Sequence, residues 1–95
     1  MNELDKLHYK SCYFCGRHTD LHKHHIYFGA NRKVSERIGA WVYLCSYHHN
    51  MGGKECVHEN RQMDLRLKRL FQRIYEMDHN RIDFIQEIGK SYLND

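Results

Sequence analysis

The stretch "WVYLCSYHH", residues 41–49, joins a strand-like segment to one cysteine and two adjacent histidines. Residues 41–45 combine aromatic and β-branched side chains, which favour a β-strand. Two residues separate Cys45 from His48, and His49 follows directly. A cysteine and a histidine at this spacing are typical of half of a zinc site. We therefore expect this strand to deliver metal ligands at the point where it ends.

A second half-site lies upstream in "CYFC", residues 12–15. Cys12, Cys15, Cys45 and His48 together can close one tetrahedral zinc with three thiolates and one imidazole. Two alternatives stay open for these positions: Cys45 as a small buried residue, and His18 in place of His48 on the metal. Cys56 stands outside the set, as a free thiol or as a substitute ligand near His58.

Length and charge set the class of protein. The 95-residue chain has four cysteines, nine histidines and a formal net charge of +3. It fits one small domain, residues 1–95, whose core leaves little stability to spare and would gain from a metal. The first residues do not resemble a signal peptide, and no apolar run approaches the length of a membrane span. We therefore expect a cytoplasmic protein that binds metal, with a secreted disulfide domain as the weaker alternative.

The remaining pattern predicts an α+β chain. Residues 20–28 alternate enough to form a strand, which pairs with residues 41–45 as a hairpin. The connection, residues 29–40, carries a possible helical turn from Ser35. Residues 1–11 form a polar lead-in or a first helical turn.

Two helices are predicted after the hairpin. An amphipathic helix begins after Asn60, a suitable N-cap, and continues to about residue 77. A shorter helix, about 81–88, ends before Gly89. The zinc-bearing part thus covers about 12–60 and the helical part about 60–90. The basic residues of the longer helix are expected to face solvent: Arg66, Lys68, Arg69 and Arg73.

The motifs "CYFC", "HKHHI", "WVYLC" and "CSYHH", in this order, resemble the HNH endonucleases with a zinc-supported His-Me finger. The resemblance covers about residues 12–60, and with "VHEN" the chain also resembles the small HNH proteins common in phages and prophages. It implies a ββα-metal fold, two strands and a helix around one divalent ion, with a zinc knuckle and C-terminal helices. The implied function is metal-dependent hydrolysis of DNA phosphodiester bonds.

The resemblance also implies roles for single residues. His24 and His49 would bind the catalytic ion (Mg²⁺, Mn²⁺, Ni²⁺ or Zn²⁺), and His25 would be the general base. His58 would be a third ligand or a phosphate contact. The family usually has Asn where this chain has Ala40. Asn31 or Asn50 is an alternative for that orienting role.

The residue types suit this chemistry independently. A histidine can take a proton from water near neutral pH, and a divalent ion stabilises the leaving oxygen. Neighbouring residues of a strand point to opposite faces. We therefore expect the strand to end or twist at His24 and His25, or the two rings to approach the phosphate from different directions. His22 shares the face of His24 and could line the site, although we expect an exposed strand histidine.

The expected partner is DNA, with no membrane contact. Basic residues would hold the phosphates: Arg32, Lys33, Arg37, Lys54 and Arg61. No base-reading helix is evident, so sequence specificity should be low. A monomer would nick, whereas a homodimer could cut both strands. The competing hypothesis is a non-catalytic zinc-ribbon module that binds nucleic acid or protein, which Ala40 favours. His24, His25 and His49, none of which the zinc needs, favour the nuclease.

Overall fold

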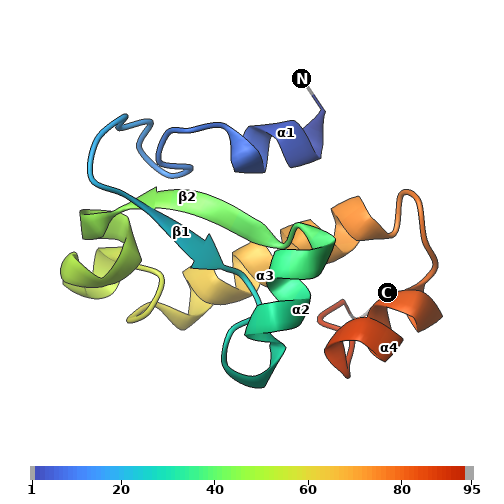
Figure 1. Cartoon of the computed structure of the whole chain (residues 1–95). Helices are drawn as coiled ribbons and strands as arrows, with labels where there is room; N and C mark the ends of the chain where they lie inside the picture. Colours follow the sequence, from blue (N-terminus) through green and yellow to red (C-terminus); the bar gives the residue numbers. More distant parts are fainter. Residues whose placement is uncertain (1, 94–95) are drawn as a thin grey trace.

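A computed structural model describes residues 2–93 of the chain. Two antiparallel strands, β1 (Leu21–His25) and β2 (Trp41–Cys45), pair over their whole length, with Leu21 opposite Cys45 and His25 opposite Trp41. The predicted hairpin and the α+β class are therefore confirmed. Figure 1 shows the strands crossing the middle of the molecule, with α1 along one side of them and α4 beside the C-terminus. The α-helices are α1 (Glu3–His8), α2 (Arg32–Ile38), α3 (Arg61–Tyr75) and α4 (Arg81–Ile88).

Strand β1 ends three residues earlier than predicted, at His25. Ile26 still donates its amide to the Ala40 carbonyl at 2.9 Å. Tyr27 instead gives its amide to the Ser35 hydroxyl, 3.0 Å away, and that hydroxyl donates to the Tyr27 carbonyl at 2.7 Å. A side chain thus takes the place of the next strand partner, and Ile26 and Tyr27 are both buried.

The connection between the strands is more helical than predicted. A 3₁₀ turn, η1 (Gly29–Asn31), leads directly into α2, which begins before Ser35 rather than at it. Ser35 is fully buried in the middle of this helix. The helix is short, but it matters for the site because it places Glu36 within hydrogen-bond distance of His25 on β1.

The two C-terminal helices begin as predicted. The Asn60 side chain caps α3 by accepting the amides of Gln62 and Met63, as expected of an N-cap. Helix α3 ends at Tyr75, slightly before the predicted limit. Helix α4 has the predicted bounds, and Gly89 ends it with φ of 105°, a left-handed conformation that favours glycine.

One core joins the helices to the strands. Its buried side chains come from every α-helix but α2, from β2 and from the segments between: Leu7, Cys12, Ile26, Tyr27, Ala40, Val42, Leu44, Cys45, Val57, Leu67, Phe71, Phe84 and Ile88. The C-terminal helices therefore pack on the strands. None of the helices within residues 2–93 has the length and apolar character that a membrane crossing requires.

The prediction that Lys68 faces solvent is wrong. Lys68 is only 6% exposed, and its ammonium group donates to the Asp64 carboxylate at 2.8 Å. Its ammonium group also lies 4.3 Å from the ring centre of Phe28. This buried ion pair lies close to the histidines of the site, because Phe28 also contacts the rings of His24 and His58.

Candidate metal centres

A single π-helical turn, η2 (Tyr47–Met51), follows β2 and carries two adjacent histidines. Consecutive residues of a helix point in different directions. His48 joins one group of metal-ligating side chains, and His49 joins another. Gly52 allows the chain to leave this turn, since a Cβ there would lie 2.4 Å from the Tyr47 carbonyl oxygen. The turn therefore holds the two groups at a fixed separation.

The first group consists of Cys12, Cys15, Cys45 and His48, whose ligand atoms all lie within 4.8 Å of one another. Cys15 Sγ is 3.8 Å from Cys45 Sγ. His48 Nδ1 is 3.6 Å from Cys12 Sγ and 3.3 Å from Cys45 Sγ. A tetrahedral zinc with bonds of about 2.3 Å to sulfur and about 2.0 Å to nitrogen would give separations of about 3.8 and 3.5 Å. The donors therefore fit a structural metal such as zinc.

The backbone around Cys12 also favours its thiolate. Burial opposes ionisation of Cys12, but backbone hydrogen bonds from Cys45, Cys15 and Phe14 favour the thiolate more, and the net effect lowers its pKa. Cys56 lies apart from the group, with its thiol donating to the Gly53 carbonyl at 3.0 Å. Among the described residues, Cys56 and His18 do not belong to the group, so the geometry does not support either as a substitute ligand, and Cys56 is the free thiol that was expected.

The second group consists of His24, His49 and His58, again with ligand atoms within 4.8 Å of one another. His49 Nε2 and His58 Nε2 are 3.1 Å apart. The His24 ring lies 5.3 Å from the His49 ring and 5.2 Å from the His58 ring, between centroids. Two imidazole nitrogens bound to one ion at about 2.1 Å would lie about 3.0–3.4 Å apart. The three rings thus have the spacing of ligands to a shared ion.

His24 gives this group its strongest chemical signature. Its side chain is 2% exposed, and its Nε2 atom has no hydrogen-bond partner. A buried polar atom without a partner costs free energy, and a metal ion would remove that cost. The donor chemistry and this orphaned nitrogen both fit a divalent ion.

Two histidines of this group, His24 and His49, favour the uncharged form that a metal requires. Burial, and then the nearby His49, His58, His25 and Lys68, lower the pKa of His24 to about 3. Burial, and then His58 and His22, lower the pKa of His49 to about 4. Both imidazoles are therefore neutral at physiological pH, as metal ligands must be.

His25 leaves the strand on the opposite side from His24. Its Nε2 lies 2.7 Å from a carboxylate oxygen of Glu36 on α2, and Lys23 donates to the other oxygen, also at 2.7 Å. The first expectation for the doublet, that the strand ends there, is confirmed, because His25 is the last residue of β1. The two rings point in different directions, as the second alternative requires.

Two adjoining hollows meet at His25. The smaller, of about 180 Å³, is lined by the three histidines of the second group with Lys23, His25, Phe28 and Arg32. The larger, of about 740 Å³, is lined by Lys23, His25, Gly29, Ala30, Arg32, Lys33 and Glu36. Lys23, His25 and Arg32 belong to both. A phosphate chain could therefore pass from one hollow to the other beside His25.

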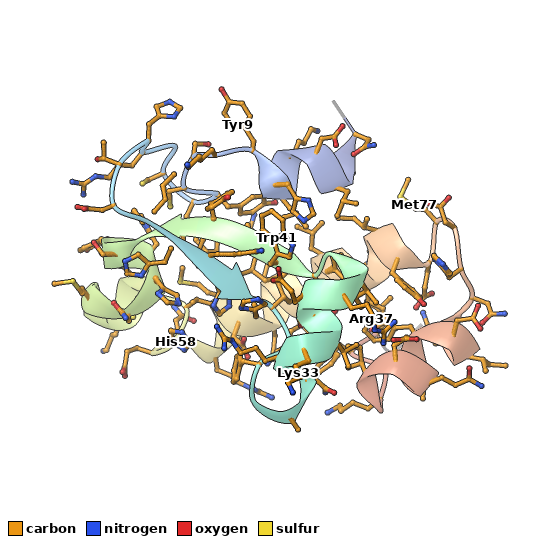
Figure 2. All side chains as sticks on the ribbon, viewed as in Figure 1. Tyr9, Lys33, Arg37, Trp41, His58 and Met77 are labelled. Atoms are coloured by element: carbon orange, nitrogen blue, oxygen red, sulfur yellow. The ribbon has the colours of Figure 1, made fainter. Side chains whose placement is uncertain are left out.

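The predicted phosphate contacts do not all lie together. Arg32 and Lys33 line the larger hollow, and Figure 2 shows Lys33 projecting from α2. Arg37, on the same helix, forms an ion pair with Glu87 of α4 and does not line either hollow. Arg61 pairs with Asp64 and lines a neighbouring hollow that reaches His58.

Lys54 lies on another side, in a hollow shared with Phe14 and His48 beside the cysteine group. Ala40 is fully buried, and its carbonyl accepts the Ile26 amide. Asn31 donates its side-chain amide to the Ile88 carbonyl at 2.9 Å, so it fastens α4 rather than entering the site. Asn50 follows His49 in η2 and is exposed.

Glu36 was not predicted at the site, and His22 was there only as the alternative that was not preferred. Glu36 was part of a connection with no assigned role, and only the position of α2 brings it to His25. His22 was expected to be exposed, but it is half-buried, and its Nδ1 lies 2.8 Å from His49 Nδ1. The alternation of β1 places His22 and His24 on one face, which was the only signal in the sequence.

Comparison with known proteins adds no relative: no family model, no curated protein and no solved structure matches this chain.

Proposed function

We propose that the chain is a metal-dependent endonuclease of the HNH type, which hydrolyses DNA phosphodiester bonds in a ββα-metal site. The observation that carries the proposal is the buried, unpartnered Nε2 of His24 beside the paired nitrogens of His49 and His58. A histidine group of this kind is not needed to close the cysteine site. The adjoining His25 supplies a separate imidazole at the edge of the same hollow.

The three histidines would hold a divalent ion such as Mg²⁺, Mn²⁺, Ni²⁺ or Zn²⁺. When bound there, the ion would supply Lewis acidity toward the phosphate and its leaving oxygen. The ligands are neutral imidazoles, so they would leave the charge of the ion undiminished for the substrate. The cysteine group would hold a structural zinc and fix η2, and with it His49.

His25 would act as the general base. When its Nε2–H donates to Glu36, the lone pair of Nδ1 is left to take a proton from water. The carboxylate also stabilises the imidazolium that forms once the proton is taken. Glu36 is held in place from the other side by Lys23. Glu36 is therefore a positioning residue for the base in this mechanism.

The substrate would lie across the two hollows, with its phosphates held by Lys23, Arg32 and Lys33. All three line the larger hollow together with His25, and a guanidinium can bind a phosphate through two hydrogen bonds. Backbone phosphates carry no sequence information, so we expect weak sequence preference. Arg61 extends the basic surface on the His58 side, whereas Arg37 and Lys54 have no part in this path.

A second candidate is a zinc-bearing module that binds nucleic acid or protein without cutting it. Ala40 favours this candidate, because its side chain offers no amide where the HNH family usually has asparagine. Asn31 is engaged elsewhere, so it does not supply that amide. If the chain is instead the nuclease, Glu36 takes the orienting role that the family usually gives to asparagine.

The test is cleavage of supercoiled plasmid by zinc-loaded protein with Mg²⁺, Mn²⁺, Ni²⁺ or Zn²⁺ added. We expect metal-dependent nicking that is lost in His25→Ala and kept in His18→Ala, a matched change at an exposed histidine. Nicked product that precedes linear product would indicate a monomer, and direct linearisation would indicate a dimer. Failure of a folded, zinc-loaded protein to cut with any of these ions would favour the binding module.

A further inference from the structure

His22 makes a contact that neither group of metal ligands includes. It lies two residues before His24 on the same face of β1, opposite Leu44. Its Nδ1 is 2.8 Å from His49 Nδ1, with the two rings nearly perpendicular at 83°. This separation is that of a hydrogen bond between the two imidazoles.

His49 therefore has both ring nitrogens directed at other histidines. Its Nε2 lies toward His58, and its Nδ1 lies toward His22. The buried Nε2 of His24 completes the set that could share an ion with His49 and His58. Within residues 2–93, His22 is not part of that set. The metal would thus take the Nε2 side of His49, leaving Nδ1 for His22.

With the ion on Nε2 of His49, the ring hydrogens of His49 and His22 have one possible arrangement. A neutral imidazole that binds metal through one nitrogen carries its hydrogen on the other. His49 bound through Nε2 must carry hydrogen on Nδ1, and that N–H donates to His22. His22 must accept with Nδ1 and carry its own hydrogen on Nε2. The contact is compatible with only this pair of tautomers once the ion is present.

We propose that His22 is a positioning residue for the histidine metal centre, and that it holds His49 in the tautomer and orientation that bind a divalent ion. The inference rests on the proposed metal centre. Partners that hold the second nitrogen of a metal-binding histidine commonly raise metal affinity by about 10- to 100-fold. In many metal sites this partner is a carboxylate or a backbone carbonyl. Here it would be the neutral imidazole of His22.

The experiment uses the full chain with its cysteine group loaded with zinc. Titration calorimetry with Ni²⁺ and Mn²⁺ measures binding of the second ion by the wild type, His22→Ala and His22→Asn. The oxygen of an asparagine side chain is as many bonds from the backbone as the Nδ1 of histidine, so it can replace the acceptor. His18→Ala is the control for loss of a histidine that lies outside both groups.

We expect His22→Ala to weaken the second ion by about 10- to 100-fold, with His22→Asn and His18→Ala close to the wild type. Nitrogen NMR of the imidazoles, with Zn²⁺ as the second ion, should show hydrogen on Nδ1 of His49. Unchanged affinity in His22→Ala, or hydrogen on Nε2 of His49, would overturn the inference and leave the proposed metal centre standing. A wild type that binds no second ion would overturn both.

Discussion

Nε2 of His25 lies 2.7 Å from a carboxylate oxygen of Glu36, although the two residues come from different elements, β1 and α2. The same carboxylate accepts a hydrogen bond from Lys23 at 2.7 Å. Hydrogen bonds, first from Lys23 and then from His25, lower the pKa of the Glu36 carboxyl. Glu36 is thus held as an acceptor that can orient the ring of His25.

This contact predicts that Glu36→Ala slows cleavage without weakening metal binding. General base catalysis is worth about 10²- to 10⁴-fold in rate. Loss of the orienting partner, with the base still present, should cost a part of that, about 10- to 100-fold. Glu36→Gln keeps an acceptor oxygen and should retain more activity than Glu36→Ala. The measurement is plasmid nicking at saturating metal, beside calorimetry of the second ion. Equal rates for wild type and Glu36→Ala would exclude this role.

His24 predicts a conflict between stability and metal binding. Its unpartnered Nε2 costs free energy in the absence of an ion, and leucine would remove that polar atom. We expect His24→Leu to bind no second ion. Its free energy of unfolding at pH 7.5 should nevertheless equal that of the wild type or exceed it by up to about 1 kcal/mol. Urea unfolding of the zinc-loaded proteins, without a second ion, measures this difference. A large loss of stability in His24→Leu would mean that the ring is needed for packing.

Acid should widen that difference. The pKa of His24 is about 3 in the folded chain, against 6.5 for the unperturbed group. Between these values the unfolded chain binds a proton that the folded chain does not, so the contribution of His24 to stability falls as pH falls. From pH 7.5 to 5.5 the wild type should lose about 1 kcal/mol relative to His24→Leu. Comparing the two proteins cancels the acid sensitivity of the cysteine group. A gap that does not grow in acid would show that His24 titrates normally.

Local signals predicted the cysteine group, the N-cap of α3 and the bounds of α4, whereas the roles of His24, His49 and His58 came from the family resemblance. Cys45 and His48 were recognised by their spacing, and Asn60 and Gly89 by the conformations that end helices. Glu36 and His22 could not be assigned in this way, because their partners depend on how α2 and η2 pack against β1. The hydrogen bonds between the Ser35 side chain and the Tyr27 backbone, which end β1, likewise could not be predicted from the hydrophobic pattern. The residues that were missed act through contacts between different helices and strands.

Lys68 gives a prediction about the core. It lay off the apolar stripe of α3, but Phe28 covers its ammonium group, and Asp64 is its buried partner. Removing one member of a buried ion pair commonly costs about 3–5 kcal/mol. The exposed Arg61, 3.4 Å from the same carboxylate, would compensate Asp64 in part, so the lower limit of about 3 kcal/mol applies. We expect Lys68→Met to lower the free energy of unfolding by about that amount. Arg66→Met, at an exposed position of the same helix, should change it by less than about 0.5 kcal/mol. Similar values for the two variants would show that the Lys68 pair contributes little.

The cysteine group predicts that folding depends on metal. A small domain whose ligands come from the two segments at the open end of its hairpin, before β1 and after β2, gains the binding free energy of the ion as folding free energy, about 10–16 kcal/mol for structural zinc in small peptides. Cys12→Ser should therefore prevent zinc retention and cooperative unfolding. Cys56→Ser is the matched control, because that thiol is also buried but donates only to the Gly53 carbonyl, a bond that a hydroxyl can keep.

Metal content by mass spectrometry under native conditions and thermal unfolding by circular dichroism measure both outcomes. We expect one tightly held zinc in the wild type and in Cys56→Ser, and loss of the folded state in both when a strong chelator is added. Because the histidine group binds through nitrogen alone, mild chelation should remove its ion first and leave the fold intact. A Cys12→Ser protein that still unfolds cooperatively with zinc bound would show that Cys15, Cys45 and His48 suffice to bind zinc. The fold would then not depend on the complete Cys12–Cys15 knuckle.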